Sequence, residues 1–310
     1  MQLYTNKSGK LEQVKEIGFK LEKEMQELTE HNLENIFGLE FIKSEFSLNN
    51  LRIDTLAFDN ENNCFVIIEF KRGSSYSVID QGFSYLSMLL NNKANFVHEL
   101  GKKRNKFIDM GSMDWSQSKV IFIADSFTRY QKESINFKDL PIELYEMKQF
   151  NNGTIIYNSI LATNTTESIK TITKLETEFK EVNKEIQTYD ENYHISSKDK
   201  NIIDIYEEFK NFTISINNSI DIVYRKKYIT FRANRKNFLD IIIGKGYLSI
   251  RLHLKKGEDI YGINSEKKLD FEYDRTTSTK QDFLIIKIKN DKDLLIMKEL
   301  IKQTYDKLNK

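Results

Sequence analysis

The chain has 310 residues, of which 39% are hydrophobic and 30% charged, a composition that supports folded domains and excludes a disordered chain. Its length suggests two domains. The one cysteine, Cys64, excludes an intrachain disulfide framework and a multi-thiolate zinc site, and favours a reducing, cytoplasmic location. We expect neither a signal peptide nor a membrane span, because no apolar run is long enough.

The charge is distributed unevenly along the chain. The 120 residues after position 190 carry 24 Lys and Arg against 18 Asp and Glu, a net charge of +6, whereas residues 1–190 carry 23 against 28, a net charge of −5. This asymmetry predicts a specialised partner for one half. Residues 161–200 are polar and threonine-rich, so we predict a linker with a short helix at Leu175–Gln187 between domains at 1–160 and 201–310.

The first domain is predicted to begin with a helix and a hairpin. Apolar residues at three- and four-residue spacing predict a helix over Phe19–Ile36. Two β-prone runs, Leu51–Phe58 and Cys64–Phe70, flank the turn-forming sequence DNENN and predict a hairpin. A second helix is expected over Val78–Leu90, because Ser77 followed three residues later by an acid is a helix-capping pattern.

Three further strands, with a helix between the first two, are predicted at Lys119–Ala124, Pro141–Met147 and Gly153–Asn158. This order of elements predicts an α/β fold with a mixed sheet flanked by helices. The second domain is predicted to be a smaller α+β unit, with a helix (Asn201–Lys210), four short strands between Ser219 and Leu254, and a closing helix (Asp293–Leu308).

Motifs for nucleotide binding and for serine or zinc hydrolysis are absent, since the sequence contains no GxxxxGK[ST], GxGxxG, GxSxG or HExxH. We therefore expect no nucleotide cofactor. The four histidines stand at no metal-ligand spacing: His31, His98, His194 and His253. Carboxylates must therefore carry any catalysis.

The predicted hairpin brings charged residues together. If its arms pair symmetrically about Glu61 and Asn62, Asp54 lies opposite Glu69, with Cβ atoms about 5 Å apart. Lys71 is two residues beyond Glu69 and shares its face of the strand.

Two carboxylates so close repel each other unless a cation lies between them. Mg²⁺ or Mn²⁺ satisfies this need, with Asp54, Glu69 and the backbone carbonyl of Phe70 as ligands and water or phosphate oxygens completing the shell. The protonated amine of Lys71 would orient the attacking water and stabilise the charge that develops on phosphorus. The implied reaction is phosphodiester hydrolysis.

The tripeptide Glu-x-Lys alone has little specificity, because it occurs five times in this chain. The alternative without a function is a solvent-exposed ion pair between the glutamate and the lysine. Only Glu69 both ends an apolar strand and has an aspartate in register, which favours the catalytic interpretation at this position.

These residues resemble the PD-(D/E)XK nuclease superfamily. Asp54, Glu69, Phe70 and Lys71 match its signature, with Ile53 in place of the nominal proline. Further resemblances lie in two helices: Glu22 resembles the helix glutamate that assists metal or water binding, and Gln81 with Tyr85 resembles the QxxxY motif of the RecB-like and NucS branch. The likeness covers about Leu21–Asn158 and implies a restriction-endonuclease-like fold. The whole chain is similar to bacterial proteins that join such a domain to a C-terminal domain of unknown function.

The resemblance implies a metal-dependent DNA nuclease, acting on single-stranded, branched or mismatched DNA in repair or defence. Two alternatives remain open: a non-catalytic protein of this fold that binds nucleic acid or another partner, and an RNA nuclease, since metal-assisted hydrolysis needs no 2′-hydroxyl. A homodimer is compatible with the sequence.

The second domain carries a basic block that is a hypothetical nucleic-acid surface. Ten basic residues and one acid, Asp240, lie between Arg225 and Lys256, interleaved with aromatic residues available for base stacking. The alternative is that these aromatics belong to the core and the lysines are merely solvated. The residues predicted to bind nucleic acid are Arg72, Arg225, Lys226, Lys227, Arg232, Arg235 and Lys236.

Overall fold

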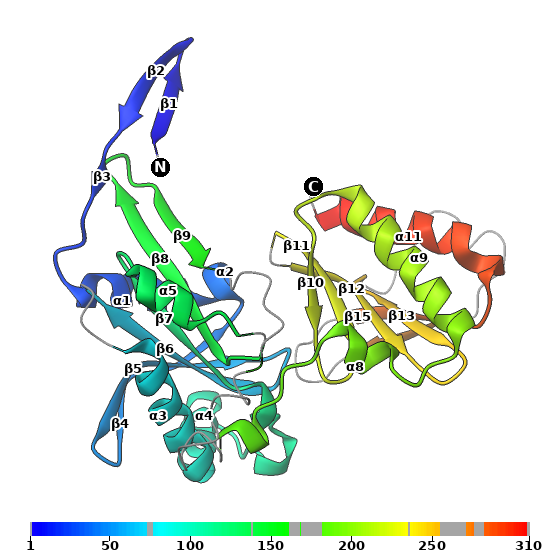
Figure 1. Cartoon of the computed structure of the whole chain (residues 1–310), viewed down its shortest axis with the longest axis horizontal. Coiled ribbons are helices and arrows are strands. Elements are labelled where there is room, and N and C mark those ends of the chain that lie inside the picture. Colours follow the sequence, from blue (N-terminus) through cyan, green and yellow to red (C-terminus); the bar gives the residue numbers. More distant parts are fainter. Residues whose placement is uncertain are drawn as a thin grey trace. The chain divides into compact units, whose positions relative to one another are not determined.

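The computed structural model describes residues 2–72, 77–137, 139–160, 168, 182–234, 236–254, 271–275 and 282–308. The chain divides into two compact units, Met1–Thr188 and Tyr189–Lys310 (Figure 1). This division falls within the linker predicted at 161–200. Of that linker, residues 161–167 and 169–181 lie outside the described residues, as does most of its predicted helix, while residues 182–185 are helical.

The first unit is built on a seven-stranded mixed sheet with the order β3-β8-β7-β6-β5-β4, and β9 pairs with β8. The pairs β6 with β7 and β7 with β8 are parallel, and the others are antiparallel. The strands are β3 (Glu16–Ile17), β4 (Glu40–Leu48), β5 (Leu51–Asp59), β6 (Cys64–Lys71), β7 (Lys119–Ala124), β8 (Ile142–Phe150) and β9 (Ile155–Ile160). A separate hairpin precedes them, made of β1 (Leu3–Lys7) and β2 (Lys10–Val14).

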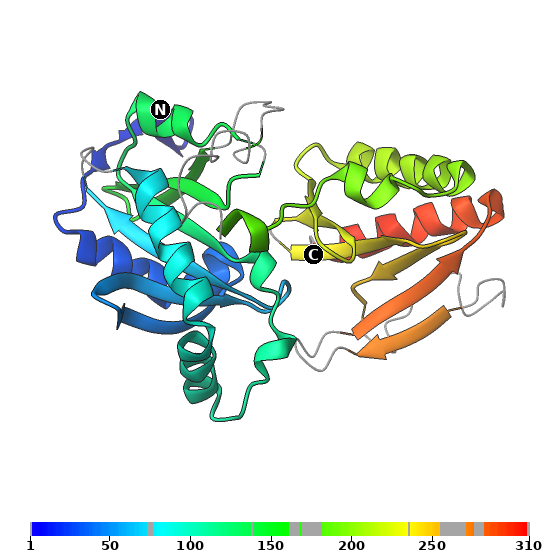
Figure 2. The same ribbon diagram turned by 60° about the horizontal axis from the view of Figure 1, so that its bottom comes forward.

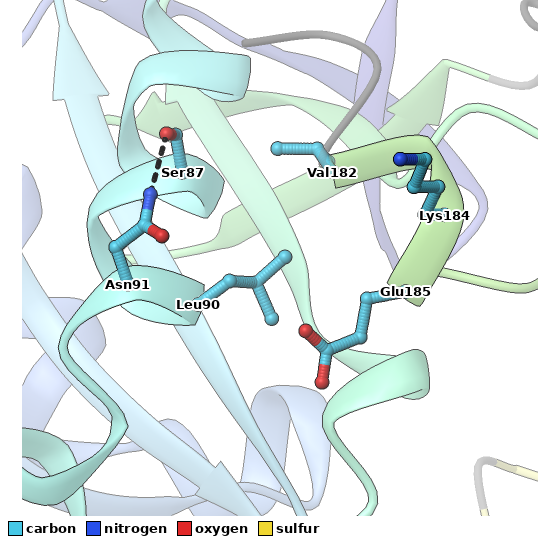
Figure 3. A pocket seen from close by; sticks show the side chains of 6 residues that line it. All are labelled: Ser87, Leu90, Asn91, Val182, Lys184 and Glu185. Atoms are coloured by element: carbon cyan, nitrogen blue, oxygen red, sulfur yellow. Dashed lines mark hydrogen bonds between the residues drawn. The ribbon is translucent and has the colours of Figure 1, made fainter.

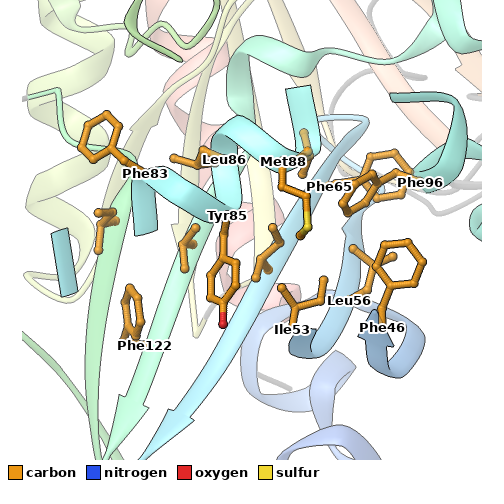
Figure 4. Packing of buried hydrophobic residues seen from close by; sticks show 14 of the residues in the cluster. Phe46, Ile53, Leu56, Phe65, Phe83, Tyr85, Leu86, Met88, Phe96 and Phe122 are labelled. Atoms are coloured by element: carbon orange, nitrogen blue, oxygen red, sulfur yellow. The ribbon is translucent and has the colours of Figure 1, made fainter. Parts of the chain in front are cut away.

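Helices cover both faces of this sheet, as predicted. One face packs against α3 (Val78–Asn91) and α4 (Lys93–Arg104), and Figure 4 shows the aromatic and aliphatic side chains of that core. The other face packs against α1 (Glu22–His31) and α2 (Leu33–Phe37). Strand β6 is buried on both faces, because its side chains alternate between the two cores. The short helix α5 (Arg129–Ser134) lies between β7 and β8 in the chain.

The predicted elements of this unit are mostly present, but the structure also contains β1, β2, β3, β4 and α4, which were not predicted. The helix expected over Phe19–Ile36 is interrupted at Asn32, whose ψ of 18° departs from helical geometry, so α1 and α2 are separate. Strand β4 was not predicted, because a register shift between Phe41 and Lys43 and a positive φ at Glu45 break its two-residue periodicity.

The second unit is an antiparallel sheet with the order β10-β11-β12-β13-β15-β14, whose one face packs against two helices (Figure 2). Two of its strands, β14 and β15, were not predicted, and α9 extends beyond the expected helix. Its elements are α8 (Glu191–Ile195), α9 (Lys200–Ile216), β10 (Asp221–Tyr224), β11 (Ile229–Ala233), β12 (Lys236–Ile243), β13 (Leu248–Leu252), β14 (Phe271–Arg275), β15 (Asp282–Ile288) and α11 (Leu294–Leu308). None of the helices in the described part of the chain combines the length and hydropathy needed to cross a bilayer.

Candidate functional site

The β5–β6 hairpin brings together the three charged residues singled out in the sequence. Its register runs from Asp59 opposite Cys64 to Thr55 opposite Ile68, which confirms the predicted symmetric pairing as far as Thr55, and Asp54 and Glu69 are the next residues on the two strands. Here the Asp54 carboxylate bonds to β6 directly, because its Oδ2 accepts a hydrogen bond from the Phe70 N–H at 2.8 Å. Lys71 Nζ lies 2.7 Å from Glu69 Oε1.

Helix α3 supplies two more side chains to this cluster. Gln81 Nε2 donates hydrogen bonds to Glu69 Oε1 at 3.1 Å and to the Tyr85 hydroxyl oxygen at 2.9 Å. The Tyr85 hydroxyl in turn donates to the Arg52 carbonyl at 3.1 Å, so it ties α3 to β5. In Figure 4 the Tyr85 ring extends from α3 toward the strands. The arrangement holds the Glu69 carboxylate in a fixed orientation.

Local sequence features explain how α3 reaches this position. Ser77 caps the helix, since its side chain accepts a hydrogen bond from the Asp80 N–H, as predicted. Gly82 then permits a close approach to the sheet, because a Cβ atom there would lie 2.5 Å from Ile142 Cδ1. A larger residue next to Gln81 would push α3 away from the strands.

The negative charges of Asp54 and Glu69 are unfavourable in their surroundings. Burial raises the pKa of Asp54 from 3.8 to about 6, and the negative charge of Glu69 adds to this rise, while the Phe70 N–H and the Lys71 ammonium oppose it. Glu69 is only 3% exposed, and its Oε2 is buried without a hydrogen-bond partner. An unpaired buried carboxylate oxygen is destabilising unless a further cation or donor meets it.

Tyr85 is suited to act as a hydrogen-bond donor. Burial, and secondly the negative charge of Glu69, raise the pKa of its hydroxyl above the ordinary value. The hydroxyl therefore stays protonated throughout the physiological pH range.

Glu22 contacts the chain that follows β6, and its role in metal or water binding stays a prediction. Its Oε1 accepts a hydrogen bond from the Arg72 N–H at 2.6 Å, which fixes the chain just beyond the end of β6. Arg72 is exposed, and its guanidinium donates to the Lys20 carbonyl. Glu22 thus borders the site from α1, on the opposite face of the sheet from α3.

Two residues near the site escaped the sequence analysis. Gln26 is buried in α1, and its Nε2 donates to the Asp54 carbonyl at 2.8 Å, which supports β5 from the α1 side of the sheet. Glu45 lies in β4 between residues that pair with Ile53 and Thr55, and its charge also raises the pKa of Asp54. The signal for Gln26 was its place beside Met25 on the buried stripe of α1; Glu45 had no signal, because β4 was not recognised.

The donor set fits a hard divalent cation. Carboxylate and carbonyl oxygens are the ligands that Mg²⁺ and Mn²⁺ prefer, and the unpartnered Glu69 Oε2 is an oxygen that a cation would satisfy. Within the described residues, no three His, Cys, Asp or Glu side chains group closely enough to hold a metal ion. Asp54, Glu69 and the Phe70 carbonyl would therefore be a partial shell, and water or substrate oxygens would complete it.

The basic block of the second unit is only partly on the surface. The prediction that Arg225 binds nucleic acid at the surface is wrong, because this side chain is 4% exposed and its Nε donates to Thr230 Oγ1 at 3.2 Å. Phe231 and Phe238 are fully buried, so the alternative that the aromatics belong to the core is correct for these two, whereas Tyr228 and Tyr247 are half-buried. Of the other predicted ligands, Lys226, Lys227 and Lys236 are exposed, Arg232 is half-buried at 3.9 Å from Asp221, and Arg235 lies outside the described residues.

A cavity of about 380 Å³ opens at the far end of α3 from Gln81 (Figure 3). Its lining residues are Ser87, Leu90, Asn91, Val182, Lys184 and Glu185. None of these contributes to the carboxylate site.

Comparisons with known proteins bear on the two units separately. Residues 191–307 match the family described as "Domain of unknown function (DUF5655)", so the predicted C-terminal domain of unknown function is confirmed. The chain is 44% identical over 229 residues to an uncharacterized protein of Haemophilus influenzae, an alignment that covers 74% of this chain and 76% of the relative.

Three solved structures show weaker likeness. A repair endonuclease from Pyrococcus abyssi is 19% identical, with 41% of this chain and 48% of that chain covered and a TM-score of 0.23. The EndoMS protein, solved as a complex with double-stranded DNA, is 20% identical, with 43% and 47% covered and a TM-score of 0.24. SfsA of Pyrococcus furiosus, in complex with Ca²⁺, is 15% identical, with 46% and 63% covered and a TM-score of 0.23. The chain thus spans about half the length of the first two structures.

Proposed function

We propose that this chain, which belongs to the same family as the uncharacterized Haemophilus influenzae protein, is a metal-dependent DNA nuclease that hydrolyses phosphodiester bonds. One observation carries the proposal: the buried Glu69 carboxylate lies close enough to the half-buried Asp54 carboxylate to raise its pKa, and one of its oxygens, Oε2, lacks a partner. A fold that needed only stability would place apolar residues here. Their retention, beside a lysine on the same face, supports a catalytic role.

Each side chain has a distinct task in this mechanism. A bound Mg²⁺ or Mn²⁺ would polarise the phosphate and lower the pKa of a coordinated water. Lys71, whose ammonium is held 2.7 Å from Glu69 Oε1, faces the same side and stabilises negative charge that develops on the phosphate. Gln81 also binds Oε1, so it leaves Oε2 free for the cation. Tyr85 positions Gln81 and donates no proton to the reaction.

The substrate class follows the sequence resemblance: DNA with single-stranded, branched or mismatched structure. The test uses purified full-length chain, a panel of such DNAs with RNA included, and Mg²⁺ or Mn²⁺. We expect cleavage that stops on adding EDTA and is lost in Lys71→Ala. Survival of every substrate with wild-type protein would remove the catalytic proposal.

A non-catalytic binding protein is the second candidate, and one contact favours it. Lys71 and Gln81 both bind Glu69 Oε1, so the carboxylate is already partly neutralised without a metal. Calorimetry separates the two functions. The nuclease should bind Mn²⁺ and lose this binding in Asp54→Ala, whereas a binding protein should show equal DNA affinity in both chains and no effect of metal.

A further inference from the structure

Strand β7, the neighbour of β6 in the sheet, ends at the same edge of the sheet as the carboxylate of Glu69. Strands β6 and β7 are parallel, with Lys71 paired to Ala124, so both strands end together. In open α/β sheets, ligands bind outside the carboxyl ends of parallel strands. The segment that leaves β7, from Asp125 into α5, therefore borders the same space as Glu69 and Lys71.

This segment presents a large aromatic ring to solvent from a fixed support. Tyr130 is 89% exposed, although it stands in the first turn of α5. The support is firm because Thr128 and Gln131 form a reciprocal capping box and Phe127 is buried beneath it. Glu146 Oε1 adds an ion pair with Lys132 at 2.7 Å. Packing gives no reason for a tyrosine at this position.

Cations accompany the ring. The Arg129 side chain is 90% exposed, and Glu133 lies 3.8 Å from its Nε, a solvent-exposed pair of little energetic weight. Arg72 is exposed just beyond the end of β6, where its guanidinium donates to the Lys20 carbonyl. The exposed Arg129 next to the exposed Tyr130 ring matches the chemistry of a nucleotide, whose phosphate binds guanidinium groups and whose base stacks on aromatic faces.

We propose that Tyr130 stacks on an unpaired base of single-stranded DNA, and that Arg129 binds an adjacent phosphate, so that the strand is held across the carboxylate site. The inference rests on the proposed nuclease function and specifies its substrate as a strand with unstacked bases. A duplex keeps its bases stacked inside and offers no face to the ring. Tyr130 is thus a specificity residue and takes no part in the chemical step.

The chain offers a matched control in Phe107. It is 93% exposed and lies in the same unit, shortly after the end of α4. Its neighbour Arg104 binds Glu40 and Asn60, and Asn60 belongs to the turn of the β5–β6 hairpin, at the opposite end from Asp54. Phe107 is therefore an exposed aromatic residue beside lysines that lies far from the proposed strand path.

The experiment measures binding separately from cleavage. All proteins are full-length and carry Asp54→Asn, so that the DNA is not cut. Each protein is titrated into a labelled oligothymidine and into a blunt duplex of equal length, and binding is followed by fluorescence anisotropy. A second substitution, Tyr130→Ala, should weaken the affinity for the oligothymidine about tenfold, because stacking of one base contributes that order of affinity. Tyr130→Phe should keep the affinity, Phe107→Ala should leave it unchanged, and duplex binding should respond to neither.

The inference is overturned if Tyr130→Ala leaves the affinity for the oligothymidine unchanged, or lowers the affinity for duplex and single strand equally. It is also overturned if Phe107→Ala or Tyr130→Phe lowers the affinity for the oligothymidine as much as Tyr130→Ala does. Absence of any binding to the oligothymidine has the same consequence. Failure of the nuclease proposal has a different signature. In that case wild-type protein cleaves no substrate, while the dependence of single-strand binding on Tyr130 persists.

Discussion

Each unit has an aspartate in its sheet, but the two aspartates differ in burial and in the groups that surround them. In the second unit Asp240 is buried and both its oxygens have partners, since Oδ1 accepts from Thr230 Oγ1 at 2.7 Å and Oδ2 lies 3.0 Å from His253 Nε2. In the first unit Asp54 is half-buried, the negative charge of Glu69 raises its pKa, and the buried Glu69 keeps an oxygen without a partner. Satisfied burial indicates a structural role, and unsatisfied burial of like charges indicates a functional one.

The largest expected effect follows from Glu69→Gln. This change preserves shape but removes the charge that a cation would need, so cleavage should fall by about a thousandfold. Circular dichroism should show an unchanged fold. Glu208→Gln is the control, because Glu208 begins another Glu-x-Lys tripeptide but pairs with Lys298 on the helices of the second unit. Equal losses in both variants would contradict the assignment.

The contrast between the units also separates what the sequence could predict from what it could not. The hairpin register and the capping of α3 were predictable, because both depend on residues close in the chain. Gln81 and Tyr85 were found through a motif at helical spacing, and the structure brings both to Glu69. These are local patterns that tertiary packing did not override.

Longer-range features were not predictable. The contribution of Glu45 depends on a strand with a bulge, whose apolar pattern is out of phase. The burial of Arg225 depends on its bond to Thr230 across a tight turn, which composition cannot reveal. The exposure of Tyr130 depends on how α5 is anchored, and a tyrosine between polar residues gives no sign of this in sequence.

The second prediction tests the satisfied aspartate. Asp240→Ala leaves the buried Thr230 hydroxyl without its acceptor and the half-buried His253 without its carboxylate partner, so the free energy of unfolding of the second unit should fall by about 2 kcal/mol. Chemical denaturation followed by fluorescence measures this change. Asp306→Ala is the matched control, because Asp306 forms a solvent-exposed helix pair with Lys302, and such a pair contributes little to stability. A similar small effect in both variants would make Asp240 dispensable.

The third prediction tests whether Asp54 lowers stability. Its pKa is raised from 3.8 to about 6, so the folded state favours the protonated form. The stabilisation from this proton is complete below about pH 3.8 and is lost as the pH rises through 6. At pH 7.5 the ionised group therefore lowers stability, and Asp54→Asn should raise the free energy of unfolding by about 2 kcal/mol.

Thermal unfolding at two pH values checks this sign. The melting temperature of Asp54→Asn should exceed that of wild type by several degrees at pH 7.5, and the gap should narrow at pH 5. Added Mg²⁺ should raise the melting temperature of wild type but leave the variant unchanged, because a ligand stabilises only the state that binds it. A gap independent of pH would mean that the substitution acts through packing and not through charge.

The smallest expected effect concerns the exposed lysines of the basic block in the second unit. We propose that they hold DNA while the first unit cuts it. Lys226 and Lys227 are exposed in the turn between β10 and β11. Each lysine that neutralises a phosphate of single-stranded DNA contributes about 0.7 to the slope of log affinity against log salt. Replacing both with alanine should therefore flatten that slope by about 1.4, while affinity at physiological salt falls only a few-fold.

The control is a double variant, Lys298→Ala with Lys302→Ala, on the helical side of the unit. It removes the same charge and should leave the slope unchanged. If both double variants flatten the slope equally, net charge alone governs DNA binding by this unit; if neither does, its basic turn contacts something other than nucleic acid.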